Sequence, residues 1–460
     1  GQVILLCGQS GCGKTTLTRL VNGLIPNYYE GKLSGEVLLD GKNISSLPLY
    51  ETAKYVGSVF QNPRTQFFTV DSTSELAFGC ENQGLPEEEI IQRVKSTAEQ
   101  FGMENLLGKN IFSLSGGEKQ KIAFASVYAM NPDIFLLDEP SSNLDGDSIR
   151  DLKNYLRILK QQGKTILIAE HRLYYLLDIA DRIVYLADGK IEKIYTPQEF
   201  RSLSGAARKH MGLRTTDIQD VHPISYQRTF LRPILTVKDV SLFYKKHPVL
   251  EHISLHASKG DIIGVVGPNG AGKTTFLRTL CGLHKEFTGC FYWREQPQKE
   301  NERLKRSYMV MQDVNYELFA DSVEAECSLG IQGSSPELVE KTLDELGLPT
   351  VRDRHPNTLS GGQKQRVAVA VSMICGKEVL VFDEPTSGLD YDSMEQVSGL
   401  IRELSKDKVI FVVTHDYEFV CQTCTRLIRF DHHTMTNDIL LSQENEATIL
   451  SLMGLGRDER

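Results

Sequence analysis

Two short stretches of this chain have the glycine and lysine spacing of a loop that binds phosphate. They read GQSGCGKTT at residues 8–16 and GPNGAGKTT at residues 267–275, and each follows a short apolar run. Both fit the pattern GxxxxGK[ST], in which glycines let backbone N–H groups point at phosphate oxygens. The lysine supplies a point charge to the β- and γ-phosphates, and the next hydroxyl binds Mg²⁺. The expected phosphate-binding residues are Gly8, Gly11, Gly13, Lys14, Thr15 and Thr16 in the first loop and Gly267, Asn269, Gly270, Gly272, Lys273, Thr274 and Thr275 in the second, with Thr15 and Thr274 as metal ligands.

A second pair of stretches places two adjacent carboxylates after a buried strand. They read LSGGEKQKIAFASVYAMNPDIFLLDEPSSNLD at 114–145 and LSGGQKQRVAVAVSMICGKEVLVFDEPTSGLD at 359–390. Each apolar run is typical of a strand in a parallel sheet. The interval from Ser115 to Asp138 equals that from Ser360 to Asp383, 23 positions, so the chain carries the same machinery twice. A Ser-Gly-Gly at the expected helix start favours an anion, and these residues are Ser115, Gly116, Gly117, Ser360, Gly361 and Gly362.

A glutamine and a histidine recur at matching places in the two copies. Gln61 and Gln312 each end a β-rich run, where the amide can reach Mg²⁺ or an attacking water. His171 and His415 each follow a strand, where an imidazole can hydrogen-bond a γ-phosphate and a carboxylate. A lone glutamine or histidine would be read as structural, but the repeated positions favour a functional role.

The length and the composition bound the class of protein. A chain of 460 residues favours two or three domains, and the repeat indicates two. We expect a first domain at 1–199, a polar linker at 200–233 and a second domain at 234–460. The net charge of −9 argues against a surface built for nucleic acid. No apolar run has the length needed to cross a bilayer, and the nine cysteines show no regular framework, which favours a reducing cytoplasm.

The order LSGGxKQ, an apolar strand, DEP and LD resembles the ATP-binding-cassette (ABC) ATPase family. The resemblance implies an α/β fold of two tandem ABC nucleotide-binding domains. Each would have a P-loop, RecA-like, mostly parallel core, an antiparallel β subdomain and a helical signature subdomain. It also implies that the halves pack head to tail within one chain, so that Lys14 faces Ser360 and Lys273 faces Ser115. The expected cofactors are ATP and Mg²⁺, and the expected activity is ATP hydrolysis.

The same resemblance assigns roles to further residues. Asp138 and Asp383 would orient Mg²⁺, and Glu139 and Glu384 would be the general bases, because adjacent strand residues point to opposite faces. Asp145 and Asp390 would couple the two sites across the interface. Tyr244 matches the aromatic residue that stacks on adenine. The chain begins at the equivalent of Gly260, so we expect the first half to lack its N-terminal strands and this base contact. Both copies keep every motif, which predicts two hydrolysing sites.

The segment after Gln61, with QNPRTQFF at residues 61–68, resembles the energy-coupling factor (ECF) transporter ATPases and their cobalt and nickel relatives. That group uses a groove behind this loop to bind arginine-bearing coupling helices of a transmembrane partner. The resemblance implies a tandem ECF ATPase at the cytoplasmic face of the membrane, bound to a transmembrane coupling subunit and a substrate-binding membrane subunit. Such a transporter takes up a vitamin or a metal ion. The second half lacks the Asn-Pro pair, so we expect its groove to bind the partner differently.

Four glutamates after the two Gln residues leave two interpretations open. Glu75, Glu81, Glu324 and Glu326 would either pair with basic coupling helices or form a solvated helix face.

Three other functions remain as alternatives. A tandem sugar-importer ATPase commonly has one degenerate site, which this chain does not show. A ribosome-associated ABC-F factor would have a long basic linker and no histidine at 171 or 415. A DNA-repair or structural-maintenance ATPase would need zinc modules or coiled-coil insertions, and none is visible.

Overall fold

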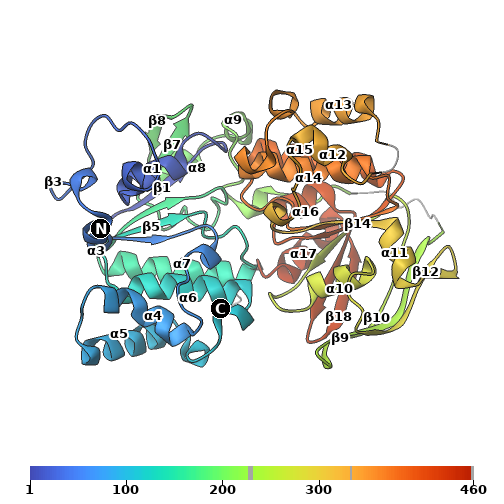
Figure 1. Ribbon diagram of the computed structural model, residues 1–460, viewed down its shortest axis with the longest axis horizontal. Coiled ribbons are helices and arrows are strands. Elements are labelled where there is room, and N and C mark those ends of the chain that lie inside the picture. The colour runs from blue at the N-terminus through green and yellow to red at the C-terminus, as the bar shows by residue number, and fades with distance from the viewer. Residues whose placement is uncertain (226–231, 332–333, 457–460) are drawn as a thin grey trace. The chain divides into compact units, whose positions relative to one another are not determined.

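The computed structural model describes residues 1–225, 232–331 and 334–456, apart from the side chain of Tyr316. It divides into two compact units, residues 1–216 and 217–460 (Figure 1). Residues 226–231 of the expected linker, and 332–333 and 457–460 of the expected second domain, lie outside the described residues.

The first unit is built on a six-stranded sheet whose middle strands are short and apolar. The strand order is β4 (Val56–Val59), β5 (Ile134–Asp138), β6 (Thr165–Ala169), β1 (Val3–Cys7), β7 (Arg182–Ala187) and β8 (Lys190–Tyr195). All neighbours are parallel except β7 and β8. Because parallel strands end at one edge, the residues that follow β1, β4, β5 and β6 are brought close together.

The second unit repeats this sheet strand for strand. Its order is β14 (Ser307–Val310), β15 (Val379–Asp383), β16 (Val409–Val413), β11 (Ile262–Val266), β17 (Arg426–Asp431) and β18 (Thr434–Leu440), with only β17 and β18 antiparallel. The expected mostly parallel core is therefore present in both units.

A separate antiparallel sheet covers one face of the second unit. It consists of β10 (His247–Ala257), β9 (Leu235–Tyr244), β12 (Phe287–Trp293) and β13 (Gln296–Pro297), in that order. Leu250 and Phe291 of this sheet share a core cluster with Phe411 of β16 and with Phe276 of the helix at 273–280. In the described part of the first unit, the separate antiparallel strands are only β2 (Leu38–Leu39) and β3 (Lys42–Asn43), and the corresponding cluster is small.

Helices cover both faces of each parallel sheet (Figure 1). In the first unit, α1 packs on one face, α6 and α7 pack on the other, and α5 packs on the outer side of α6. The helices of the first unit are α1 (Lys14–Val21), α2 (Leu24–Asn27), α3 (Leu49–Tyr55), α4 (Ser72–Asn82), α5 (Glu87–Gln100), α6 (Gly116–Ala129), α7 (Gly146–Gln161), α8 (Pro197–Arg201) and α9 (Gly205–His210). Those of the second unit are α10 (Lys273–Leu280), α11 (Glu300–Arg306), α12 (Val323–Ser328), α13 (Pro336–Glu345), α14 (Gly361–Ile374), α15 (Tyr391–Ser405), α16 (Tyr417–Thr423) and α17 (Glu446–Leu452).

Short 3₁₀ turns connect these elements. They are η1 (Ile44–Ser46), η2 (Pro63–Thr65), η3 (Glu104–Leu106), η4 (Ile111–Ser113), η5 (Ile218–Asp220), η6 (Val314–Tyr316), η7 (Pro349–Val351), η8 (Pro356–Thr358) and η9 (Gln443–Asn445). Among the described helices, none combines the length and the hydropathy that a bilayer-crossing segment requires.

The described parts of the expected linker are packed rather than extended. Phe200 is fully buried, and Leu213 joins the same core cluster of the first unit. After residue 216 the chain packs on the second unit. There the N–H of Ile224 donates to the Cys421 carbonyl at 2.9 Å, and the Tyr417 hydroxyl donates to the Val221 carbonyl at 3.2 Å.

Candidate nucleotide-binding sites

Each glycine loop leaves the central strand of its sheet and ends at the N-terminus of a helix. Lys14 is buried, and its Nζ donates to the carbonyls of Gly8 and Gln9, both at 3.0 Å. Lys273 repeats this arrangement, with Nζ donating to Gly267 O at 2.7 Å and Pro268 O at 2.9 Å. The loop thus holds its own cation at the positive end of α1 or α10, which favours an anion there.

The first glycine of each loop is required by the strand beside it. A Cβ at Gly8 would lie 2.2 Å from the Leu186 carbonyl oxygen, and one at Gly267 would lie 2.0 Å from the Phe430 oxygen. Both distances are far inside van der Waals contact. The remaining loop glycines, Gly11, Gly13, Gly270 and Gly272, all have positive φ, which favours glycine.

A hydroxyl and a carboxylate meet at the end of each loop. Thr15 Oγ1 donates to Asp138 Oδ1 at 3.2 Å, and Thr274 Oγ1 donates to Asp383 Oδ2 at 2.9 Å. Burial, and then the neighbouring Glu139 carboxylate, raises the pKa of Asp138 to about 6. Burial likewise raises the pKa of Asp383. A hydroxyl and a carboxylate are hard oxygen ligands of the kind that Mg²⁺ prefers. Burial disfavours the charged form of the carboxylate, so a cation beside it fits this site.

The carboxylate after each of these aspartates lies beside the predicted histidine. In the first unit, Gln61 Nε2 donates to Glu139 Oε2 at 2.6 Å, and His171 Nε2 lies 3.5 Å from Glu139 Oε1. In the second unit, His415 Nε2 lies 3.6 Å from Glu384 Oε1. The structure places Gln312 two residues after the end of β14, as Gln61 lies two residues after the end of β4.

The backbone at both glutamates has the left-handed conformation. Glu139 has φ 47° and Glu384 has φ 55°, values uncommon for residues other than glycine. Their N–H groups donate to Ala169 O at 2.8 Å and Val413 O at 2.9 Å, which anchors each turn to the adjacent strand. Strain of this kind persists where surrounding structure enforces it, and it concentrates at functional sites.

The signature residues form helix caps in their own units. Ser115 Oγ accepts from Glu118 N at 3.3 Å, while Glu118 Oε2 accepts from Ser115 N at 2.8 Å, and Ser360 makes the same capping box with Gln363. Gly116, Gly117, Gly361 and Gly362 form the first turns of these helices. Asp145 and Asp390 cap α7 and α15, accepting from Ser148 N and Ser393 N, both at 2.8 Å. Within each unit, the phosphate loop, carboxylates, glutamine and histidine gather at the sheet edge, whereas the signature residues cap a helix.

The candidate base-stacking residue is accessible. Tyr244 lies at the end of β9 with 59 % of its surface exposed. The Lys245 ammonium lies 5.7 Å from the ring centroid.

A buried acid beside each histidine was not predicted as a site residue. Glu170 accepts from the N–H groups of His171 at 2.8 Å and Arg172 at 3.1 Å, and from the Tyr175 hydroxyl at 2.9 Å. In the second unit Asp416 replaces it, accepting from Thr386 Oγ1 at 2.9 Å. Both acids fix the turn that carries the histidine. The sequence signal was an acidic residue adjacent to His171 and His415, at different positions in the two copies.

Two of the four glutamates after Gln61 and Gln312 fit neither interpretation of the sequence. Glu75 is buried, and its Oε2 accepts from Phe68 N at 3.1 Å, Thr69 N at 2.8 Å and Thr69 Oγ1 at 2.9 Å. Glu326 is also buried and accepts from Phe319 N and Ala320 N, both at 2.7 Å. These carboxylates bind the chain's own backbone, so they are neither partner-binding nor solvated. Glu324 pairs with Arg352, and Glu81 is exposed.

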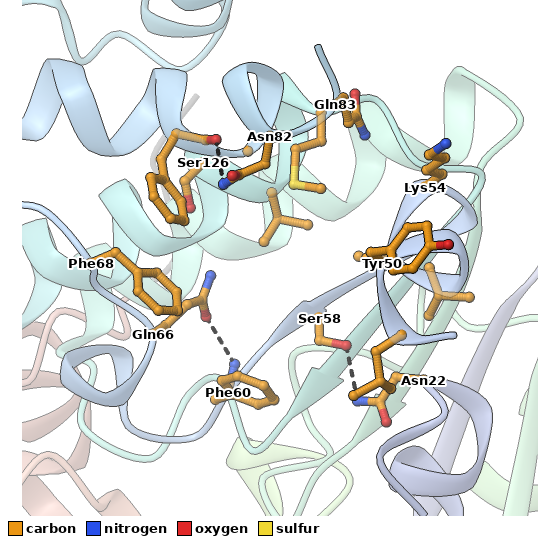
Figure 2. A pocket seen from close by; sticks show the side chains of 18 of the residues that line it. Asn22, Tyr50, Lys54, Ser58, Phe60, Gln66, Phe68, Asn82, Gln83 and Ser126 are labelled. Carbon is orange, nitrogen blue, oxygen red and sulfur yellow. Dashed lines mark hydrogen bonds between the residues drawn. The ribbon is translucent and has the colours of Figure 1, made fainter. Parts of the chain in front are cut away.

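A cavity of about 450 Å³ lies behind the loop that follows Gln61 (Figure 2). Its walls come from α3, β4, the loop itself, α4 and α6, and its lining is largely apolar. The rings of Phe68 and Phe78 stack there, with centroids 4.8 Å apart. Gln66 fixes the loop to the wall, because its Oε1 accepts from Phe60 N at 3.3 Å and its Nε2 donates to Ala123 O at 3.0 Å.

Comparisons with known proteins agree with this arrangement. The ABC transporter family model matches residues 1–142 and 250–387. A "Putative ABC transporter ATP-binding protein" of Treponema denticola is 48% identical, over 97% of this chain and 93% of that protein. The "Putative HMP/thiamine import ATP-binding protein YkoD" of Bacillus subtilis is 32% identical, over 91% of this chain and 83% of that protein.

Solved structures share the two-domain fold. A chain in the crystal structure of the complex of archaeal ribosomal stalk protein aP1 and archaeal ribosome recycling factor aABCE1 has a TM-score of 0.66 and 25% identity, covering 98% of this chain and 88% of that one. With both the family model and full-length relatives matched, this chain belongs to the ABC transporter family and is an ATP-hydrolysing enzyme with two tandem ABC domains.

Proposed function

We propose that this chain is the tandem ATPase subunit of an ECF-type transporter and powers the uptake of a vitamin or a metal ion. The observation that carries the proposal is the apolar cavity behind the QNPRTQ loop, because this loop connects the nucleotide site to a surface that a partner helix can occupy (Figure 2). The name of the B. subtilis relative, which refers to HMP/thiamine import, supports a vitamin as cargo.

We assign the nucleotide chemistry to the residues gathered at the sheet edge. Lys14 and Lys273 bind the β- and γ-phosphates of ATP, and the loop N–H groups orient them. Thr15 and Asp138, with Gln61, would hold Mg²⁺ in the first site, and Thr274, Asp383 and Gln312 would hold it in the second. The ion, when bound, supplies positive charge that offsets the charge of the phosphates.

Glu139 and Glu384 accept a proton from the attacking water in this proposal. His171 and His415 lie within 3.6 Å of these carboxylates and keep them oriented toward the γ-phosphate. Tyr244 stacks on adenine in the second half. Ser115, Ser360 and the glycines that follow them complete the site of the opposite half, and Asp145 and Asp390 couple the two sites.

The cargo does not contact this chain in the proposed transporter. A substrate-binding membrane subunit binds it, and a transmembrane coupling subunit inserts a helix into the cavity behind Gln61. The chain is then held at the cytoplasmic face of the membrane by its partners. The cavity is lined by Tyr50, Phe60, Phe68 and Phe78, which suits an apolar anchor on that helix.

Affinity purification of the tagged full-length chain from its own cells, after mild detergent solubilisation of the membranes, tests this function. We expect two integral membrane proteins to co-purify, and Tyr50→Asp, which introduces a charge into the cavity, to release both. Recovery of ribosomal proteins in place of membrane proteins would overturn the proposal. Likeness to the ribosome recycling factor does not favour that outcome beforehand, because it concerns the fold of two ABC domains.

A further inference from the structure

The loops that follow Gln61 and Gln312 are each fixed by the side chain five positions after the glutamine. In the first unit this side chain is Gln66, whose amide has an oxygen that accepts and an NH₂ group that donates. Its Oε1 accepts from Phe60 N, and its Nε2 donates to the carbonyl of Ala123 on α6 at 3.0 Å. Both hydrogen-bonding ends are therefore used, and η2 is held against α6.

In the second unit, Glu317 stands at this position. Its Oε1 accepts from Met311 N at 2.6 Å, which reproduces the first bond of Gln66. Its Oε2 is buried and has no hydrogen-bond partner among the described residues. By the repeat, Ala368 on α14 corresponds to Ala123, and η6 packs on α14 as η2 packs on α6. A carboxylate can only accept, so only a protonated Glu317 can reproduce the donor bond of Gln66.

The surroundings of Glu317 favour that proton. Burial raises the pKa of Glu317 to about 7, and the nearby carboxylates of Glu326 on α12 and Asp383 at the end of β15 add to the shift, against the opposing bond from Met311 N. Tyr308 on β14 also faces this carboxyl, because burial and then the Glu317 carboxylate raise the pKa of Tyr308. A cation on α14 near this loop, Lys364, binds another residue of the loop: its Nζ donates to Asn315 Oδ1 at 2.6 Å.

We propose that Glu317 is a positioning residue that works as a neutral carboxylic acid. Its Oε2–H donates to a carbonyl of α14, in the place of the Gln66 amide, and so holds the loop that carries Gln312. The inference rests on the proposed role of Gln312 at the second site. The reaction involves only the transfer of a proton between this carboxyl and solvent.

The sign of the pH effect follows from the direction of the shift. A carboxyl with a raised pKa binds its proton more tightly in the closed loop than in an open one, so the proton stabilises closure less and less as the pH rises from the ordinary pKa of 4.5 to about 7. Above that pH a buried carboxylate has no donor at Oε2, and the loop loosens. The first unit has no equivalent acid, so only the second site should depend on pH in this way.

Two substitutions test the inference as a matched pair. In a Glu139→Gln background, the remaining ATP hydrolysis comes from the site that contains Glu384. Its rate should decline above about pH 7, approaching tenfold per pH unit. Adding Glu317→Gln restores a donor and should remove this decline without lowering activity at neutral pH. In a Glu384→Gln background, Gln66→Glu should introduce the same alkaline decline at the first site. A decline that persists in Glu317→Gln would overturn the inference.

A direct readout of the proton does not depend on hydrolysis or on any membrane partner. Infrared difference spectra between the wild-type chain and Glu317→Gln should contain a carboxylic-acid carbonyl band at about pH 6 that disappears by about pH 8.5. Absence of the band at about pH 6 would also overturn the inference. Failure of the transporter proposal would leave both results unchanged, because both are measured on the purified chain.

Discussion

The chemistry of each unit is concentrated in a few side chains at the carboxyl edge of its sheet. Asp138 and Glu139 are adjacent in sequence, yet their contacts differ. Asp138 accepts from Thr15 on the glycine loop, whereas Glu139 lies between Gln61 and His171. The turn at Glu139 separates the two carboxylates, so one is available to a cation and the other to water.

Replacement of the general bases tests this division of roles. Glu139→Gln and Glu384→Gln should each remove hydrolysis at one site, and the double variant should lose at least about 10²-fold in ATPase rate, because the amide cannot accept the proton of water. ATP binding should persist, since the phosphate contacts remain. Glu87→Gln, at an exposed position on α5, is the control and should hydrolyse at the wild-type rate. Rapid hydrolysis by the double variant would assign the base elsewhere.

The raised pKa of Asp138 predicts how Mg²⁺ binding depends on pH. The pKa is about 6 in the folded chain, against an ordinary value of 3.8, so protons compete with the ion below about pH 6. The affinity for Mg²⁺ in the presence of ATP should rise up to about tenfold per pH unit until pH reaches about 6, and then level off. The folded chain binds this proton more tightly than the unfolded chain does. The contribution of Asp138 to folding stability therefore falls as the pH rises from about 4 to about 6. Calorimetric titration should show the rise for the wild type and a smaller one for Asp138→Asn, in which Asp383 at the second site still has a raised pKa.

At the scale of elements, a buried glutamate fixes the segment that leads from each glutamine to the next helix. Glu75, on the first turn of α4, accepts three hydrogen bonds from Phe68 and Thr69. Glu326 repeats the arrangement from α12. The position of the aromatic side chain of Phe68 in the cavity wall therefore depends on a carboxylate that never faces a partner.

Glu75→Ala should loosen this wall. Two N–H groups and a hydroxyl would lose their acceptor, at a cost of about 1–3 kcal/mol for each group that stays buried. Hydrogen exchange in peptides covering residues 66–72 should become faster, and the membrane partner should bind more weakly. Glu81→Ala, on the exposed side of the same helix, should change neither quantity. Equal effects of the two substitutions would show that charge, and not the backbone contacts, matters.

The sequence predicted the residues proposed to contact the nucleotide better than the buried acids that hold the neighbouring loops in place. The glycine loops, the Asp-Glu pairs and the strand-end Gln and His could be predicted because the motifs recur at equal spacing in both halves. The burial of Glu75 could not, since its neighbours in sequence read as a charged helix face. Glu170 and Asp416 were missed for a related reason, because their partners are backbone groups brought near by the fold.

At the scale of the molecule, each unit contains its own sheet and its own core. The two large clusters of the second unit draw only on residues after 216, and they include the antiparallel sheet. The corresponding cluster on the α1 face of the first unit has five buried members. We therefore expect the two units to differ in stability.

Excision tests the independence of the second unit. Residues 217–460 should fold alone, unfold cooperatively on heating and bind ATP, because the core and the phosphate loop are complete within them. ATP hydrolysis should be lost or greatly slowed, since the proposed site needs the signature of the other half. Circular dichroism and equilibrium nucleotide binding check the two statements. Full hydrolytic activity of this fragment would contradict the composite site.

The left-handed turn at Glu139 and Glu384 has a consequence for laboratory evolution. An L-residue in this conformation costs about 1–2 kcal/mol more than glycine, partly offset by the greater freedom of glycine in the unfolded chain. A screen that rewards heat resistance alone should therefore accumulate glycine at residues 139 and 384. The selected variants would be more thermostable but would lack their general bases. A selection for a more stable enzyme must therefore measure ATP turnover in every round.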